Sequence, residues 1–360
     1  MQTIELVNLD SIQEARRQIE ICNACRYCES YCSVFPAVHS KRAFSDGDLV
    51  QLANLCHNCR GCYYACQYTA PHEFAMNVPA ALARVRQESW QENAVPRRLA
   101  RAFHHSGVAI SLAVIAGLMS ILLLMSGAGD SDQSGFYGLM SHNLMALLFV
   151  PAFLLPLLAI GWSVRRYWKR IGGQRLALAH LRGALSRAGR MKDLSGGHGD
   201  GCNFEQEDRF SNARRWCHQM TMYGFLLCFA ATSVATLMHY LFDLPAPYDL
   251  KSLPKLLGVP GGLLLSAGTL GLALLKLRAD RTLADARVWG GEMAFVVLLF
   301  LVSSSGLLLY LLGSTPALAP LLAFHLGAVL AFFLLMPYSK MVHGFYRLAA
   351  LLRDEQTRAS

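Results

Sequence analysis

Apolar residues beyond position 100 are gathered into runs that carry charge only at their ends. A run of about 20 apolar residues is long enough to cross the hydrocarbon core of a bilayer as an α-helix. The first 100 residues mix polar and apolar positions and contain no such run. The pattern therefore predicts six transmembrane helices, at Gly107–Gly127, Met140–Trp162, His218–Phe242, Gly258–Leu277, Glu292–Gly313 and Leu318–Pro337.

The same pattern divides the chain into a head and a membrane domain. We expect a mainly α protein with a head over residues 1–96, a six-helix membrane domain over 97–350 and a short tail over 351–360. A long connector, residues 163–217, joins the second and third spans and includes the glycine-rich stretch SGGHGDGC. This connector is too long for a simple turn, so we expect it to be partly helical and to lie on the membrane surface.

Basic residues orient the predicted helices. They crowd the connector 163–217, precede the first span, separate the fourth from the fifth and follow the sixth. The loops after the first, third and fifth spans offer only Lys251 and Lys255. Because basic loops stay on the cytoplasmic side, we predict a multi-pass protein of the cytoplasmic (inner) membrane with both termini and the connector in the cytoplasm. The lipid bilayer is then a binding partner of the chain, and we expect no nucleic-acid partner.

Composition supports a membrane protein and draws attention to cysteine. Only 16% of the 360 residues are charged, against about 25% in a soluble domain. Eight of the eleven cysteines fall in two windows, Cys22–Cys32 (the first ladder) and Cys56–Cys66 (the second ladder). Their spacing is too tight and regular for the disulfide framework of a secreted protein. We therefore expect reduced thiolates in a cytoplasmic head.

Each ladder has the pattern C-x2-C-x2-C-x3-C, which is typical of proteins that bind two [4Fe–4S] clusters. The short intervals let one loop present three thiolates to one cluster. In two-cluster ferredoxins the fourth cysteine binds the other cluster. This crossed pattern predicts one cluster on Cys22, Cys25, Cys28 and Cys66, and the other on Cys56, Cys59, Cys62 and Cys32.

The ladders depart from the ferredoxin pattern in one respect. Proline usually follows the last cysteine, whereas Ser33 and Gln67 stand here and proline is delayed to Pro36 and Pro71. We interpret this as a changed exit turn. The alternatives are zinc, which prefers two separated C-x2-C pairs, and disulfides, which a reduced compartment disfavours.

Histidines lie inside or at the ends of two predicted spans, where a buried polar ring requires a reason. His325 and His343 are 18 residues apart, so both project from one helix face, about 27 Å apart along the axis. His218 and His239 mark the two ends of the third span. This arrangement is typical of a bundle of cytochrome b type that binds haem b between paired histidines. We expect His218 to pair with His343 near the cytoplasm, and His239 with His325 near the outer face.

Other histidines compete for these roles. His142 could replace His239, and His104 or His105 could replace a histidine of the inner pair. Histidines at helix ends also bond to lipid headgroups or to the backbone without binding a cofactor. One haem and two haems both stay open.

The remaining residues indicate no bond-making site. Cys202, Cys217 and Cys228 are interpreted as ordinary thiols. No G-x-G-x-x-G follows a predicted strand, and no Ser/His/Asp or paired-carboxylate constellation is visible. We therefore expect no flavin or substrate-dehydrogenating site in this chain.

Three stretches resemble the tricarballylate- and citrate-utilisation protein B family. They are EICNACRYCESYCSVFPA from Glu20, LANLCHNCRGCYYACQYTAPHEFAMNVP from Leu52, and GCNFEQEDRFSNARRWCHQMTMYGFLLCFAAT from Gly201. The family carries a histidine pair in the last stretch, whereas here Gln219 follows His218, so His218 is the better candidate ligand. The resemblance implies a membrane electron-transfer protein that accepts electrons from an FAD-dependent dehydrogenase similar to tricarballylate dehydrogenase. It passes them through two [4Fe–4S] clusters and haem to the membrane quinone.

Two other functions are compatible with the pattern. One is a tricarboxylate transporter with a redox-sensing head, although only Pro151 and Pro156 hint at the broken helices that transporters use. The other is a membrane-anchored regulator whose ladders bind zinc. Neither needs the histidines at matched depths, so electron transfer is the preferred interpretation.

Overall fold

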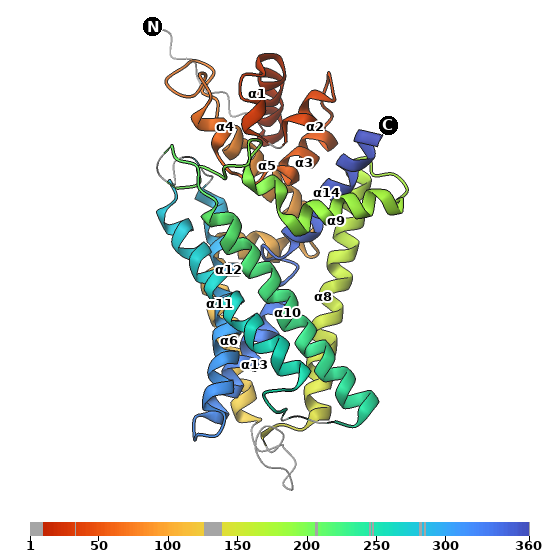
Figure 1. Ribbon diagram of the computed structural model, residues 1–360, viewed down its shortest axis with the longest axis vertical. Helices are drawn as coiled ribbons and strands as arrows, with labels where there is room; N and C mark the ends of the chain where they lie inside the picture. Colours follow the sequence, from red (N-terminus) through yellow and green to blue (C-terminus); the bar gives the residue numbers. More distant parts are fainter. Residues whose placement is uncertain are drawn as a thin grey trace.

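The protein is described by a computed structural model covering residues 10–32, 34–125, 139–205, 208–244, 246, 248–280, 283 and 286–359. Within these ranges it is helical and has no β-strand beyond an isolated bridge between Cys202 and Ser211. The prediction of a mainly α protein is confirmed. Figure 1 shows a cap of short helices at one end of a bundle of long ones, with α1 and α14 at that same end.

Six helices are long and apolar enough to cross a membrane, one for each predicted run. The prediction of a multi-pass membrane protein is confirmed to that extent. These helices are α6 (Arg97–Leu124), α8 (His142–Arg170), α10 (Ala213–Phe242), α11 (Leu253–Arg278), α12 (Ala286–Leu312) and α13 (Leu318–Leu335).

Several helices extend beyond their apolar runs. Helix α6 begins at Arg97 and is kinked at Ser106 (φ −127°, ψ 31°), beside the predicted start at Gly107. Helix α8 continues through Pro151 and Pro156 without a break. Hydrophobicity marks the length that lipid covers, whereas a helix continues as long as its backbone hydrogen bonds do. The apolar runs therefore locate the helices but understate their length.

Helices α10 and α11 approach each other closely through glycines. A β-carbon on Gly268 of α11 would lie 2.6 Å from the backbone nitrogen of Thr221 in α10. One on Gly224 of α10 would lie 2.5 Å from the backbone nitrogen of Leu265 in α11. Only glycine permits this approach, which is a common way to pack helices in membranes. Beside this pair, α6, α12 and α13 pack on one another.

We expect the substitution Gly268→Leu to lower the free energy of unfolding by about 1–3 kcal/mol, because the new side chain must push two backbones apart. The midpoint of thermal unfolding in detergent measures this effect. Gly117→Leu in α6 is the matched control, since a β-carbon there meets nothing within 4 Å. Equal losses in both variants would contradict a special role for the α10–α11 contact.

The head is built from short helices around α5 (Val78–Asn93). Helices α1 (Ser11–Cys25) and α3 (Asp46–Leu55) both pack on α5, while α2 (Phe35–His39), α4 (Gly61–Tyr64) and the 3-10 turn η1 (Glu29–Tyr31) follow the cysteines. Helix α3 starts at a capping box, in which Ser45 and Asp48 satisfy each other's backbone N–H groups. The capping box fixes the start of α3, and α3 leads into the second ladder.

The end of the chain and the connector return to the head. Helix α14 (Val342–Ala359) leaves the bundle, packs on α3 and runs unbroken through the predicted tail boundary at residues 350–351. The connector is partly helical, as expected, through α9 (Leu178–Arg190) and the turn η2 (Lys192–Ser195). Arg187 of α9 bonds to Asp354 of α14 at 2.5 Å, which joins the connector to the end of the chain.

Candidate metal centres

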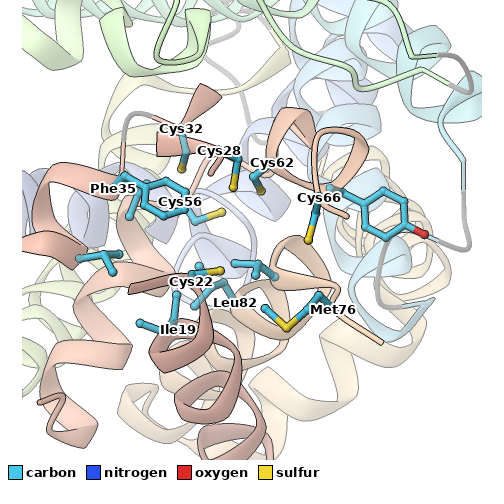
Figure 2. Close-up of a pocket in the computed structure, with 14 residues that line it drawn as sticks. Ile19, Cys22, Cys28, Cys32, Phe35, Cys56, Cys62, Cys66, Met76 and Leu82 are labelled. Carbon is cyan, nitrogen blue, oxygen red and sulfur yellow. The ribbon is translucent and has the colours of Figure 1, made fainter. Parts of the chain in front are cut away.

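The two ladders meet around one apolar cavity in the head (Figure 2). Its wall also includes Ile19 of α1, Phe35 of α2 and Leu82 of α5. Segments more than 20 residues apart in sequence thus place their sulfur atoms on one wall. The cysteines that line the cavity are Cys22, Cys28, Cys32, Cys56, Cys62 and Cys66.

The last cysteine of the second ladder lies beside the first ladder. Burial, followed by the charges of Cys28, Cys66 and Cys25, raises the pKa of Cys22 to about 12. Burial and then the charge of Cys66 raise the pKa of Cys28 to about 11. These mutual effects require the four sulfur atoms to lie close together. Cys25 is the exposed member of the set.

The last cysteine of the first ladder, Cys32, likewise lies beside the second ladder. Burial, followed by the charges of Cys59 and Cys56, raises the pKa of Cys32 well above its usual value. The pKa of Cys62 is also raised well above its usual value by burial, and then by Cys32, Cys59 and Cys56. Cys32 thus lies close to the second ladder, while Cys62 is also affected by Cys28 of the first ladder. This arrangement is compatible with the crossed pattern, and the division into two ligand sets stays a prediction.

A [4Fe–4S] cluster fits the chemistry of each set. Four thiols in an apolar wall resist ionisation, and a bound metal supplies the positive charge that makes four thiolates stable together. No three histidine, cysteine or acidic side chains in the described ranges converge on one ion position. The sulfur atoms instead surround a space, which suits a cluster several atoms across better than a zinc ion held at about 2.3 Å.

The ladder loops have the backbone shape that this wrapping needs. Arg26, Asn58 and Arg60 adopt left-handed conformations, with φ of 57°, 53° and 66°. The backbone N–H of Asn58 donates to Cys56 Sγ at 3.4 Å, and that of Tyr68 donates to Cys66 Sγ at 3.4 Å. Such N–H donors stabilise the negative charge of a cluster's sulfur ligands and adjust its reduction potential.

The glycine-rich part of the connector lies against both ladders, which the sequence did not predict. The N–H of Gly197 donates to the carbonyl of Tyr31 at 3.3 Å, and the N–H of Asn203 donates to that of Cys59 at 2.8 Å. A β-carbon on Gly197 would collide with the backbone of Ser30, so glycine is needed there. Cys202 is buried next to this contact, and its charge contributes to the raised pKa of Cys59. In the sequence, the glycines of SGGHGDGC were the feature that could have indicated this contact.

The structure brings His218 of α10 and His343 of α14 together, as predicted for the inner pair. Their ring centroids are 5.7 Å apart and the ring planes meet at 75°. His343 Nδ1 bonds to the carbonyl oxygen of Lys340, which leaves Nε2 free to bind a metal. Burial, followed by the charges of His218, Lys340 and Arg347, lowers the pKa of His343 well below its usual value. The ring is therefore neutral at pH 7, the form that binds iron.

The outer histidines are arranged differently from the predicted pair. His239 stacks on His142, with ring centroids 3.8 Å apart and planes 8° from parallel. Metal–nitrogen bonds are about 2 Å long, so an iron does not fit between rings stacked this closely. His325 instead bonds through Nδ1 to Ser305 Oγ at 2.9 Å. His239 and His325 thus have other neighbours in this structure, and His142, the weaker candidate in the sequence, is the residue beside His239.

Fold and ladders together define the class: a multi-pass membrane protein with a ferredoxin-like cysteine head. More narrowly, the chain belongs to the citrate utilization protein B family. The family model matches residues 94–360, and the model of the family's Fer4-like domain matches residues 15–92. The resemblance seen in the sequence is confirmed.

A relative and the search of solved structures complete the comparison. Citrate utilization protein B of Escherichia coli is 43% identical over 345 residues, which cover 94% of this chain and 91% of the relative. No solved structure matches the chain.

Proposed function

We propose that the protein carries electrons from a cytoplasmic FAD-dependent dehydrogenase to the membrane quinone. The single observation that carries this proposal is the position of the ladders. Cysteines of both ladders line one cavity in a head that lies at the end of the bundle where His218 and His343 are close together. When bound, two [4Fe–4S] clusters and haem b supply one-electron carriers, and the residues of the chain hold and order them.

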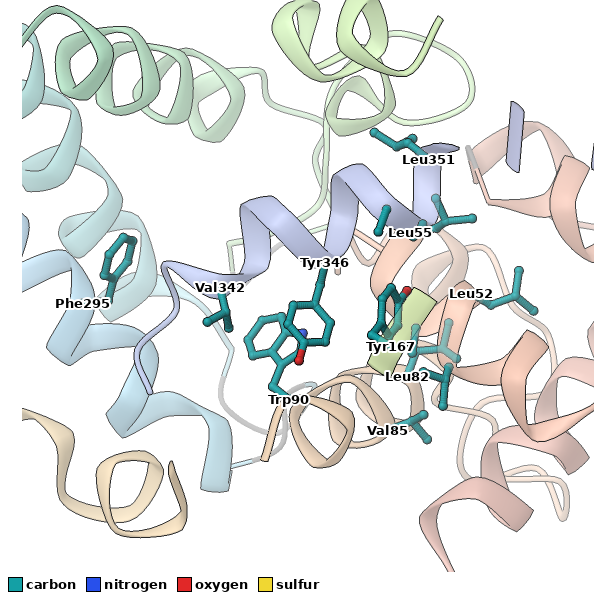
Figure 3. Close-up of a cluster of buried hydrophobic side chains, with 14 of the residues drawn as sticks. Leu52, Leu55, Leu82, Val85, Trp90, Tyr167, Phe295, Val342, Tyr346 and Leu351 are labelled. Atoms are coloured by element: carbon teal, nitrogen blue, oxygen red, sulfur yellow. The ribbon is translucent and has the colours of Figure 1, made fainter. Parts of the chain in front are cut away.

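A firm contact between head and bundle supports a fixed electron path. Trp90 of α5 and Tyr167 of α8 both pack against Tyr346 of α14, with ring centroids 6.3 and 4.7 Å from it (Figure 3). Gln51 of α3 donates to the carbonyl of Ala350 in the same core. Buried aromatic contacts of this kind restrict relative motion of the parts they join. Electron transfer over a fixed distance requires such rigidity.

The exposure of the first ladder and the orientation of the chain in the membrane indicate where electrons enter the protein. Cys25 and its neighbour Tyr27, which is 65% exposed, face solvent, so a partner flavoprotein can approach the first ladder. The name of the relative connects it with citrate, and we infer that the partner oxidises a tricarboxylic acid of the citrate or tricarballylate type. In the orientation that basic loops favour, the head and both termini face the cytoplasm, where this partner is located.

The proposal predicts quinone-dependent reoxidation of the reduced protein. Anaerobic protein in detergent is reduced with photoreduced flavin and then mixed with a soluble quinone analogue such as menadione. We expect the EPR signals of reduced clusters and the optical bands of reduced haem to disappear together, because electrons leave through the bundle. Iron, sulfide and haem are counted per chain on the same sample. Signals that persist after quinone is added would contradict the proposed function.

A further inference from the structure

Three arginines from three helices hold the loop that carries Cys56 and Cys59. Arg86 of α5 donates to the carbonyls of Cys56 at 2.8 Å and Ala53 at 3.2 Å. Arg347 of α14 also donates to the Cys56 carbonyl, at 2.8 Å. Arg214 of α10 donates to the carbonyl of Asn58 at 3.0 Å. Three guanidinium groups around one short loop concentrate positive charge on the second ladder.

Two of these arginines come from the helices that carry the inner histidines. Arg214 precedes His218 by four residues in α10, and Arg347 follows His343 by four residues in α14. Residues four apart lie on the same face of a helix, one turn from each other. Each histidine of the pair is therefore one turn away from an arginine that bonds to the second ladder. Arg347 also bonds to His57, which lies inside the ladder loop.

The first ladder lacks this link. In its loop, the Arg26 side chain donates only to the carbonyl of Asn23 among the described hydrogen bonds, and this side chain is exposed. None of the described hydrogen bonds joins residues 22–28 to an arginine of a bundle helix. The two cysteine sets are thus electrically and mechanically unequal, although their sequence patterns are the same.

We propose that Arg347, with Arg214 and Arg86, is a positioning residue that makes the set Cys32, Cys56, Cys59 and Cys62 the exit of the head. This inference rests on the proposed function. Positive charge and N–H donors near a cluster stabilise its reduced, more negative state and so raise its reduction potential. The same contacts hold the cluster site close to His218 and His343. This shortens the distance that an electron travels into the bundle.

The electron balance of the proposed order is simple. If Cys22, Cys25, Cys28 and Cys66 hold one cluster and Cys32, Cys56, Cys59 and Cys62 hold another, an electron lost by the first cluster would reduce the second. The second cluster would return to its oxidised form when the same electron reduced a haem held by His218 and His343. No bond is made or broken and no proton is required. Arginine keeps its charge at neutral pH, so Arg347 brings a positive charge to the loop.

The test uses Arg347→Gln in the full holoprotein, with a redox titration followed by EPR. We expect one cluster potential to fall and the other to stay unchanged, and haem reduction through the head to slow by about tenfold or more, as for other partners of metal ligands. Arg347→Lys keeps the charge and should recover part of the potential. Arg358→Gln removes a charge from the same helix on an exposed turn and should change neither potential.

Arg214 of α10 bonds to the same loop. The variant Arg214→Gln therefore tests the inference if Arg347→Gln folds poorly. Unchanged potentials in both variants, with full iron content, would overturn it. A shift confined to the cluster of the first set would overturn it as well. Absence of two clusters in the unmodified protein would instead remove the proposed function, and iron and sulfide counts distinguish that failure from the others.

Discussion

Replacing Cys66 with alanine is expected to remove the cluster held by the first ladder and to leave the other cluster in place. Cys66 belongs to the second ladder by sequence, but its sulfur lies beside Cys22 and Cys28 and affects the ionisation of both. A [4Fe–4S] cluster is held by four cysteine thiolates, so losing one of them should destabilise it. Iron should fall from about eight to about four atoms per chain, with the loss of one of two EPR signals.

A double variant decides between crossed and uncrossed ligation. Under crossed ligation, Cys25→Ala with Cys66→Ala keeps about four iron atoms, because both residues serve the same cluster. Under uncrossed ligation the same double variant keeps no cluster, since each substitution removes a different one. Cys228→Ala in α10 is the control, because this thiol lies between α10 and α11, away from the ladders. Loss of both clusters in the double variant would contradict the crossed assignment.

Local sequence patterns were enough to predict the six long apolar helices. An apolar run long enough to span a bilayer has few alternatives to a helix, because unpaired backbone groups are costly in lipid. The cysteine spacing likewise encodes a loop whose geometry is largely independent of the rest of the chain. The assignment of Cys66 and Cys32 to the opposite ladders rests on this spacing and stays a prediction.

Contacts between distant segments could not be predicted in the same way. The spacing of His325 and His343 predicted one continuous helix with both rings on one face, and this is wrong, because α13 ends at Leu335 and α14 begins at Val342. The spacing also does not say which helices are neighbours. Helix α10 packs mainly along α11, and its His239 stacks on His142 of α8, not on His325. The arginines around Cys56 come from three helices, and nothing local in the sequence marks them as partners of one loop. Both failures concern tertiary packing, which periodicity does not encode.

The substitution His343→Ala is expected to abolish haem binding at the inner face of the bundle. His343 is held by the Lys340 carbonyl with Nε2 free, and its ring faces that of His218. Removing one axial ligand of a bis-histidine haem changes the optical spectrum and weakens retention during purification. We expect haem per chain to fall by about one, measured against protein concentration after extraction. His218→Ala should give the same loss, and the two together no more, because both serve one iron.

His105→Ala is the matched control, since this exposed histidine at the start of the bundle bonds to Ser106 and lies outside the pair. Unchanged haem content and spectra in both His218→Ala and His343→Ala would contradict the assignment and return His104 and His105 to consideration. Haem that survives only in part would locate a second site in the outer half of the bundle. There His325, which is half-buried, lies against Gly306 and bonds to Ser305, is the residue whose replacement should remove it. The inner pair is therefore tested independently of the number of haems.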